Sequence, residues 1–184
     1  MPVVEFSKVI YDAPKIAICI DRLCKQLIEV HGDFSTSVLI GLQPRGIALT
    51  QRIFSRLSSM LQKEINWSAL DVSMYRDDFR HNQKYIEMYP TSISVNLDNK
   101  KVILIDDVLF TGRTIRSGLD ALLDFGRPAS VELLVLIQRN LSLHFPIAPT
   151  YIGKRVDTLS SQSIRVQWQE KDGIDQVILI DKKW

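Results

Sequence analysis

The chain is organised around the run Val102-Ile103-Leu104-Ile105-Asp106-Asp107-Val108-Leu109-Phe110-Thr111-Gly112-Arg113-Thr114. Its first four residues are apolar and three of them are β-branched, which is typical of a buried strand in a parallel sheet. Two carboxylates follow, and then a short turn that contains Gly112. Helical spacing of apolar residues begins directly after the turn, so we expect one buried helix face to carry Ile115, Leu119, Leu122 and Leu123.

This order of residues has a chemical meaning. Backbone N–H groups at a helix N-terminus are unpaired and suit a phosphate. Gly112 permits close approach of the backbone, and the hydroxyls of Thr111 and Thr114 can add hydrogen bonds. Asp106 and Asp107 repel a phosphate, but they suit the two hydroxyls of a ribose or a divalent cation. The pattern therefore predicts a site for a ribose 5-phosphate.

A second loop follows an earlier apolar run in the same way. Residues 38–42 are predicted to form a buried strand, and a helix is expected from about 47 to 61. Between them lies Gln43-Pro44-Arg45-Gly46. Ligands of open α/β sheets bind at the carboxyl ends of the strands. Arg45 and the backbone beside it are therefore expected to bind an anion.

The remaining periodic segments complete an alternation of strands and helices. A helix is predicted between a cap at Asp12 and an end at Gly32, and strands are predicted at 70–76 and 131–137. Two alternating segments, 164–168 and 175–180, are expected to pair as antiparallel strands at the end of the sheet. The predicted fold is a single α/β domain with a mostly parallel, doubly wound sheet.

The run from Val102 to Thr114 resembles the phosphoribosyl-pyrophosphate (PRPP) motif of type I phosphoribosyltransferases. Its form, Asp-Asp-Val-Leu-Phe-Thr-Gly-Arg-Thr, is closer still to the PyrR family of pyrimidine-operon attenuators, which also act as uracil phosphoribosyltransferases. The loop ending in Arg45-Gly46, the string Tyr75-Arg76-Asp77-Asp78 and Tyr151-Ile152-Gly153-Lys154 also match that family. The resemblance implies the type I fold, with a small hood formed by about 138–184 and the N-terminal segment.

The resemblance also implies the reaction and the site. It implies transfer of 5-phosphoribose from PRPP to uracil, giving UMP and pyrophosphate. It also implies Mg²⁺ bound through PRPP, with Asp106 and Asp107 as its candidate protein ligands. Asp106, Asp107 and Arg80 are the expected catalytic residues. Residues 77–94 are expected to form a lid over the pyrophosphate. The expected substrate-binding residues are Pro44, Arg45, Arg76, Val108, Leu109, Phe110, Thr111, Gly112, Arg113, Thr114, Arg139 and Val156.

The chain departs from the family pattern next to the base site. PyrR proteins commonly have Asp-Arg-Gly or Asp-Arg-Arg where this chain has Gln138-Arg139-Asn140. The neutral Gln138 removes a charge there, so a purine or an oxidised pyrimidine stays open as the acceptor base. An RNA-binding attenuator with weak or vestigial catalysis is the alternative function, and its candidate phosphate contacts are Arg22, Lys25, Lys154 and Arg155.

Composition sets the remaining expectations. The chain has 184 residues, 46% hydrophobic and 24% charged, with a formal net charge of +2. These values are typical of a globular domain and do not by themselves indicate nucleic-acid binding. Two cysteines five residues apart in a predicted helix point in different directions, so we expect no disulfide. We expect a cytoplasmic protein without a membrane span or a secretory signal, and a homo-oligomer.

Overall fold

The computed structural model describes residues 4–75, 89–93 and 95–183. Its larger sheet has five strands in the order β3-β2-β4-β5-β6, and every neighbouring pair is parallel. This arrangement confirms the predicted parallel sheet. The strands are β2 (Ser37–Leu42), β3 (Trp67–Leu70), β4 (Lys101–Leu109), β5 (Ser130–Asn140) and β6 (Tyr151–Asp157).

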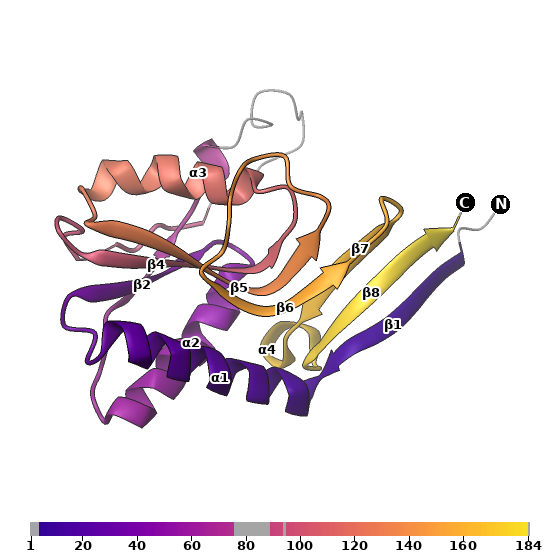
Figure 1. The fold of residues 1–184 in the computed structure, drawn as a ribbon, viewed down its shortest axis with the longest axis horizontal. Helices are drawn as coiled ribbons and strands as arrows, with labels where there is room; N and C mark the ends of the chain where they lie inside the picture. Colours follow the sequence, from indigo (N-terminus) through magenta and orange to yellow (C-terminus); the bar gives the residue numbers. More distant parts are fainter. Residues whose placement is uncertain (1–3, 76–88, 94, 184) are drawn as a thin grey trace.

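Helices cover both faces of this sheet, as predicted. Helices α1 (Ala13–His31) and α2 (Gly46–Leu61) lie on one face, and α3 (Arg113–Leu122) lies on the other (Figure 1). Each face has its own apolar core, one beneath α1 and α2 and one beneath α3. The inner strands are therefore buried on both sides, and this explains why β2 and the first part of β4 are continuous apolar runs.

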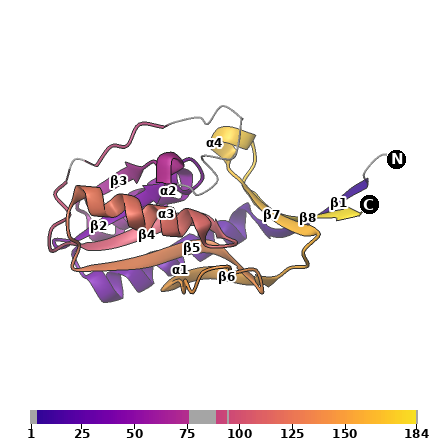
Figure 2. The same cartoon turned by 90° about the horizontal axis from the view of Figure 1, so that it is seen from above.

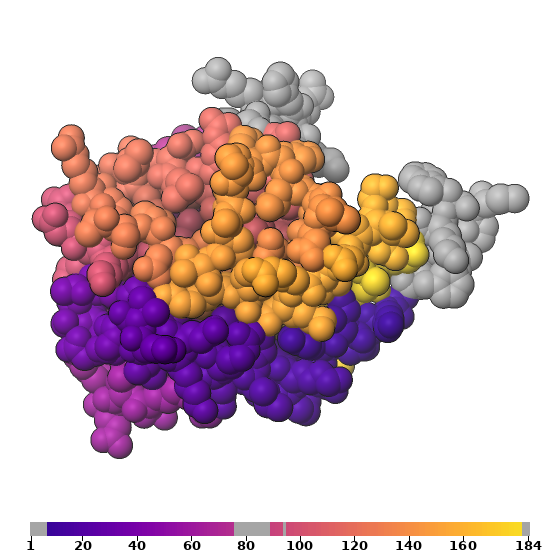
Figure 3. Space-filling model, viewed as in Figure 1, coloured from indigo at the N-terminus to yellow at the C-terminus, as the bar shows by residue number. Residues whose placement is uncertain are grey.

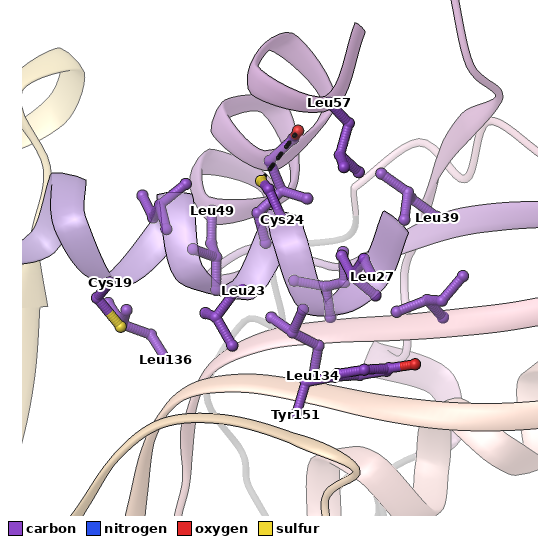
Figure 4. Close-up of a cluster of buried hydrophobic side chains, with 14 of the residues drawn as sticks. Cys19, Leu23, Cys24, Leu27, Leu39, Leu49, Leu57, Leu134, Leu136 and Tyr151 are labelled. Carbon is purple, nitrogen blue, oxygen red and sulfur yellow. Dashed lines mark hydrogen bonds between the residues drawn. The ribbon is translucent and has the colours of Figure 1, made fainter. Parts of the chain in front are cut away.

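Helix α1 begins and ends where its sequence predicts. The Asp12 side chain accepts a hydrogen bond from the backbone N–H of Lys15 at 3.1 Å, and Gly32 follows the last turn. The buried face of α1 packs between α2 and strands β5 and β6 (Figure 4). Cys19 and Cys24 are both buried free thiols on different sides of the helix, as expected, and Cys24 lies against the carbonyl of Ile53. Helix α1 and strand β6 are also neighbours at the surface, where the atoms of α1 (indigo) border those of β6 (orange) (Figure 3).

A second, smaller sheet lies beside the first (Figures 1 and 2). It contains β1 (Val4–Asp12), β8 (Gln176–Lys183) and β7 (Gln162–Gln167) in the order β1-β8-β7, all antiparallel, and α4 (Gln169–Asp172) connects β7 to β8. The antiparallel pairing of the last two predicted strands is confirmed, but their predicted place at the end of the main sheet is wrong, because they pair with β1 in a separate sheet. Strand β1 was not predicted, because its partner lies at the other end of the chain. Strand β6 belongs to the larger sheet, so residue 138 does not mark the boundary between the two sheets.

The predicted strand at 70–76 is wrong. Strand β3 ends at Leu70, and Ser73–Tyr75 forms one turn of 3₁₀ helix. The carboxylate of Asp71 accepts hydrogen bonds from the backbone N–H and the hydroxyl of Ser73, at 2.9 and 2.6 Å. An Asp side chain bonded in this way stabilises a turn and ends the strand.

Helix α3 turns a different face inward than the leucine spacing predicts. Ile115 and Leu122 are buried as expected, but Leu119 and Leu123 are exposed. The inner face instead contains Gly118, where a Cβ would lie 3.0 Å from the side chain of Leu42. Small residues on this face allow α3 to lie close to the sheet, and its buried residues are Ile115, Ser117, Gly118, Ala121 and Leu122.

Within the described ranges, no helix is long and apolar enough to cross a membrane.

Candidate active site

The acidic pair lies at the carboxyl end of β4, the central strand of the larger sheet. From β2 the chain continues to β3 on one side of the sheet, and from β4 it continues to β5 on the other. The gap between the carboxyl ends of β2 and β4 is therefore the topological switch point, where open α/β sheets bind their ligands. Both predicted loops, 43–46 and 110–114, begin at this edge.

Asp106 and Asp107 line two different cavities. Successive residues of a strand point to opposite faces of the sheet. Asp106 lines a cavity of about 210 Å³ together with the turn after β4. Asp107 lines a cavity of about 260 Å³ together with Arg45. The two carboxylates therefore stand between two neighbouring binding spaces, and each faces its own.

The smaller cavity has the features of a phosphate site. It is lined by Asp106 and by the run from Val108 to Ile115. Gly112 adopts φ = 86°, a left-handed conformation that favours glycine, and stands as the N-cap of α3 without a side-chain cap. The first turn of α3 lines this cavity, and the N-terminal end of a helix suits an anion. Thr111 and Thr114, which the sequence predicts to bind the phosphate, both line this cavity.

A neighbouring loop supports the turn. The hydroxyl of Ser142 donates to the carbonyl of Phe110 at 3.2 Å, and the N–H of His144 donates to the carbonyl of Thr111 at 3.0 Å. Ile147 packs so close to Gly112 that a Cβ there would lie 3.0 Å from its Cδ1 atom. The sequence did not indicate these supporting contacts, because no local pattern links residues 142–147 to the turn.

The larger cavity joins three elements. It is lined by Arg45 from the loop after β2, by Asp107 and Val108 from β4, and by residues 163–166 of β7. A Cβ at Gly46 would lie 2.3 Å from the carbonyl oxygen of Ile105, so only glycine lets this loop lie so close to the end of β4. The contribution of β7 was not predicted, since its alternating pattern showed a strand but not what the strand faces.

Burial shapes the ionisation of the acidic pair. Both carboxylates are buried, and loss of solvation raises the pKa of Asp106 well above its ordinary value. The same cause raises the pKa of Asp107 to about 6, while the positive charge of Arg45 opposes both shifts. Without a ligand the pair therefore takes up a proton easily. A cation or a positively charged sugar would favour the doubly ionised form.

Two predicted substrate-binding residues lie away from these cavities. Arg139 is buried, and its guanidinium donates to the hydroxyl of Thr158 at 3.0 Å and to the carbonyl of Gln162 at 2.8 Å. It also covers the ring of Phe110 at 3.9 Å. Arg139 thus supports the turn from behind. Val156 is partly buried and packs against the core beneath α1.

Other predicted residues lie at the site or cannot be placed. Pro44 and Arg45 are exposed in the loop after β2, and Val108, Leu109, Phe110 and Arg113 line the smaller cavity with the threonines. Arg76 and Arg80, and most of the predicted lid, lie outside the described residues.

A larger groove of about 410 Å³ lies along α2, between Gln51 and Glu170. Its arginines are already paired: Arg52 binds Glu170 at 2.9 Å, and Arg56 binds Asp21 at 2.5 Å. The chemistry of the acidic pair and Arg45 makes the edge of the sheet the better candidate despite the size of this groove.

Comparison with known proteins agrees with this geometry. Residues 7–171 match the family described as "Phosphoribosyl transferase domain". "Bifunctional protein PyrR" of Actinobacillus pleuropneumoniae is 40% identical over 177 residues, which cover 96% of this chain and 98% of that protein. The chain belongs to the PyrR family. The PyrR protein of Bacillus mycoides is 38% identical over 176 residues, 95% of this chain and 97% of that protein.

The solved structures agree on the fold. A hypoxanthine phosphoribosyltransferase of Trypanosoma cruzi superposes with a TM-score of 0.72 at 13% identity, covering 96% of this chain and 97% of that one. This likeness shows the type I phosphoribosyltransferase fold. As a member of the PyrR family, the chain is a phosphoribosyltransferase, an enzyme of the glycosyltransferase class.

Proposed function

We propose that this enzyme transfers 5-phosphoribose from PRPP to uracil, producing UMP and pyrophosphate. The observation that carries the proposal is the buried acidic pair, which stands between a phosphate cavity and a cavity lined by Arg45. A ligand with a phosphate at one end, a diol in the middle and a pyrophosphate at the other end matches this order of groups.

The residues have complementary roles in this reaction. Breaking the anomeric bond leaves positive charge on the ribose and negative charge on the departing pyrophosphate. Asp106 and Asp107 hold the sugar hydroxyls and stabilise the positive sugar, or one of them acts as the general base. The turn at 111–114 anchors the 5-phosphate, so that binding energy far from the reacting bond orients the sugar. Arg45 neutralises the pyrophosphate.

The acidic pair is also a suitable partner for Mg²⁺. This ion is usually held by one or two carboxylates together with substrate phosphates, and Asp106 and Asp107 supply such oxygens at the edge between the cavities. Among the described residues there is no group of three or more His, Cys, Asp or Glu side chains that could hold a metal ion. The ion would therefore arrive with PRPP and add positive charge beside the pyrophosphate.

The remaining predicted residues complete the proposal. Arg76 and Arg80 are proposed as further pyrophosphate contacts from the lid. Arg139 is proposed to act on the base site through Phe110, and the three-stranded sheet, through β7, is proposed to form the hood over the acceptor base. The Oε1 atom of Gln138 accepts a hydrogen bond from Nε of Arg155 at 3.2 Å, so this neutral residue is already engaged.

Pyrophosphate release from PRPP tests the proposal. The purified enzyme with Mg²⁺ should release pyrophosphate with uracil and much more slowly with hypoxanthine, guanine or orotate. Faster release with one of those bases would overturn the choice of uracil. Absence of release with every base would overturn the catalytic proposal itself.

RNA binding is a second candidate function, favoured by the name "bifunctional" of the PyrR relatives. Lys25, Lys154 and Arg155 are exposed on α1 and β6, although Nε of Arg155 donates to Gln138 and Nζ of Lys154 lies 5.5 Å from the ring centre of Tyr11. Arg22 is engaged elsewhere, because its guanidinium donates to the carbonyls of Ile152 and Gly153 at 3.0 and 2.7 Å. With so few free cations in this area, we propose weak RNA binding with a shallow salt dependence.

A gel-shift titration with a pyrimidine-operon leader stem-loop at two salt concentrations measures this binding. Nanomolar binding at physiological salt that UMP strengthens would make attenuation the primary function. We further propose a cytoplasmic homo-oligomer, whose size sedimentation velocity would measure.

A further inference from the structure

Residues 89–92 form a short segment attached to the end of β3. The N–H of Tyr89 donates to a carboxylate oxygen of Asp71 at 2.8 Å, and the N–H of Ser92 donates to the carbonyl of Ala69 at 2.9 Å. The N–H of Asp71 in turn donates to the hydroxyl of Thr91 at 3.1 Å. We name residues 89–92 the return segment. These hydrogen bonds fix its main chain beside the carboxyl ends of β3 and β2.

Gln43 is held between the return segment and β3. Its N–H donates to the carbonyl of Leu70 at 2.9 Å, which extends the parallel ladder of β2 and β3 by one residue. Its side-chain amide donates to the carbonyl of Pro90 at 2.7 Å. Both partners of Gln43 are therefore main-chain carbonyls. Leu70 comes directly before residues 71–89 in the sequence, and Pro90 comes directly after them.

Arg45 lies two residues after Gln43, so its position depends on where the backbone at Gln43 is held. On its other side, Gly46 packs against the carbonyl of Ile105 at a distance that leaves no room for a Cβ. Arg45 itself is exposed and lines the cavity of Asp107. A long, exposed side chain loses much rotamer freedom when it binds an anion, so a backbone that is fixed on both sides of Arg45 lowers the entropic cost of binding.

We propose that Gln43 is a positioning residue for PRPP: it anchors the loop that carries Arg45 to the return segment and so sets the affinity for the pyrophosphate half of the substrate. The proposal rests on the proposed function, in which Arg45 contacts pyrophosphate. Gln43 acts through the loop, and the phosphate cavity after β4 is independent of it.

The substitution Gln43→Met tests the proposal. Methionine keeps the length and the absence of charge but removes the donor to Pro90. The carbonyl of Pro90 is then left to water, which the exposure of Pro90 allows. Loss of this hydrogen bond should raise the dissociation constant of PRPP with Mg²⁺ by about tenfold in calorimetry. The dissociation constant of ribose 5-phosphate, which lacks the pyrophosphate, should stay within about twofold.

Two further variants separate positioning from damage to the fold. Gln51→Met on α2 is the matched control, because Gln51 is exposed and does not line the cavity of Arg45 and Asp107; it should leave both affinities unchanged. Arg45→Gln should reproduce the selective loss for PRPP. The double variant, Gln43→Met with Arg45→Gln, should bind PRPP less than about twofold more weakly than Arg45→Gln alone, since the effects of substitutions at coupled residues do not add.

Each outcome decides between specific alternatives. Equal loss of affinity for PRPP and ribose 5-phosphate in Gln43→Met would show a general structural role and overturn the proposal. Unchanged PRPP affinity, or a full additional tenfold loss on top of Arg45→Gln, would also overturn it. If the parent enzyme itself binds ribose 5-phosphate but not PRPP, the proposed function fails instead, and the two failures remain distinguishable.

Discussion

At the scale of single residues, the acidic pair shows how adjacent side chains acquire separate roles. Asp106 and Asp107 are neighbours in the chain, but strand geometry directs them into different cavities. Their shared burial raises both pKa values, while Arg45 limits the shift. The protein therefore holds two carboxyl groups where loss of solvation disfavours their ionised forms, as is common at functional sites.

The double substitution Asp106→Asn and Asp107→Asn should remove catalysis without unfolding the protein. Loss of preorganised charge at the sugar should cost on the order of 3 kcal/mol of transition-state stabilisation, a decrease of kcat by more than about a hundredfold. Steady-state pyrophosphate release measures it. The control is Asp120→Asn on the exposed face of α3. Turnover equal to that of the parent would mean that the carboxylates are only structural.

The pH dependence of the enzyme should report Asp107. Burial raises its pKa to about 6, so the ionised form that the sugar needs is lost as the pH falls through 6. We expect kcat/KM of the parent to decrease between pH 7 and pH 5. The sign is opposite for stability, because a raised carboxylate pKa makes the folded state bind more protons than the unfolded state below pH 6. Asp107→Asn should therefore raise the melting temperature at pH 7, and a lower melting temperature would contradict this.

Glycine at position 46 should be required for PRPP binding by the loop that carries Arg45. A Cβ there would lie 2.3 Å from the carbonyl of Ile105, so Gly46→Ala must displace the loop that carries Arg45. Calorimetry should show at least about a tenfold loss of PRPP affinity, since an anion contact must be rebuilt. Gly173→Ala is a useful comparison, because its Cβ would meet no atom within 4 Å, although its positive φ adds strain. Unchanged affinity in Gly46→Ala would contradict the placement of the loop.

At the scale of elements, a buried polar cluster joins α1 to the sheet at the edge opposite the site. His31, in the last turn of α1, lies 2.9 Å from the hydroxyl of Ser37 and 3.1 Å from that of Tyr151. Glu132 lies 3.2 Å from His31 and accepts from the Tyr151 hydroxyl at 2.6 Å. The cluster connects the end of α1 to β2, β5 and β6. Burial lowers the pKa of His31, although the charge of Glu132 opposes this shift.

This cluster should make the stability of the fold depend on pH. Because the pKa of His31 is lower in the folded state, the unfolded chain binds more protons below its ordinary value of 6.5. The contribution of His31 to the free energy of unfolding, measured by urea titration as the difference between the parent and His31→Gln, should fall as the pH decreases from 7.5 to 5.5. His31→Gln should be less stable at pH 7.5, by about 1–3 kcal/mol, and should lose less between these pH values. His144→Gln, at an exposed position, is the control. Equal pH dependence in parent and His31→Gln would contradict this role.

At the scale of the whole molecule, Arg52 connects the two sheets. From α2 it binds Asp175 at 2.7 Å and Glu170 at 2.9 Å, and it lies 4.6 Å from the ring centre of Trp168. These partners all belong to the segment between β7 and β8. Since β7 also lines the cavity of Asp107, this connection helps to hold the small sheet over the site.

The two acidic partners of Arg52 should differ in what they contribute. Asp175 is largely buried and Glu170 is exposed, with side-chain exposures of 20% and 63%. Asp175→Asn should lower the free energy of unfolding by about 1 kcal/mol, while Glu170→Gln should change it by less than about 0.5 kcal/mol, because exposed ion pairs contribute little. Urea unfolding of both variants measures the difference. The reverse order of effects would contradict the larger contribution of the buried partner Asp175.

The sequence by itself determined the features that local patterns encode. The apolar run of β4, the acidic pair, the glycine turn and the cap at Asp12 each depend on neighbouring residues, and the structure contains all of them where they were predicted. The antiparallel pair near the C-terminus also has a short-range origin. A family resemblance carried in these same motifs was enough to predict the fold and the class of reaction, because the chemistry is concentrated at strand ends.

The tertiary structure alone decided what depends on distant partners. Strand β1 forms because residues 4–12 pair with residues 176–183, which no local pattern indicates. Leu119 faces outward because Gly118 lets α3 lie close to the sheet. Arg139 lies behind Phe110 and not in a cavity, because the start of β7 supplies its partners. In each case the type of side chain is given by the local sequence, but the surroundings of that side chain are set by packing between segments far apart in the chain.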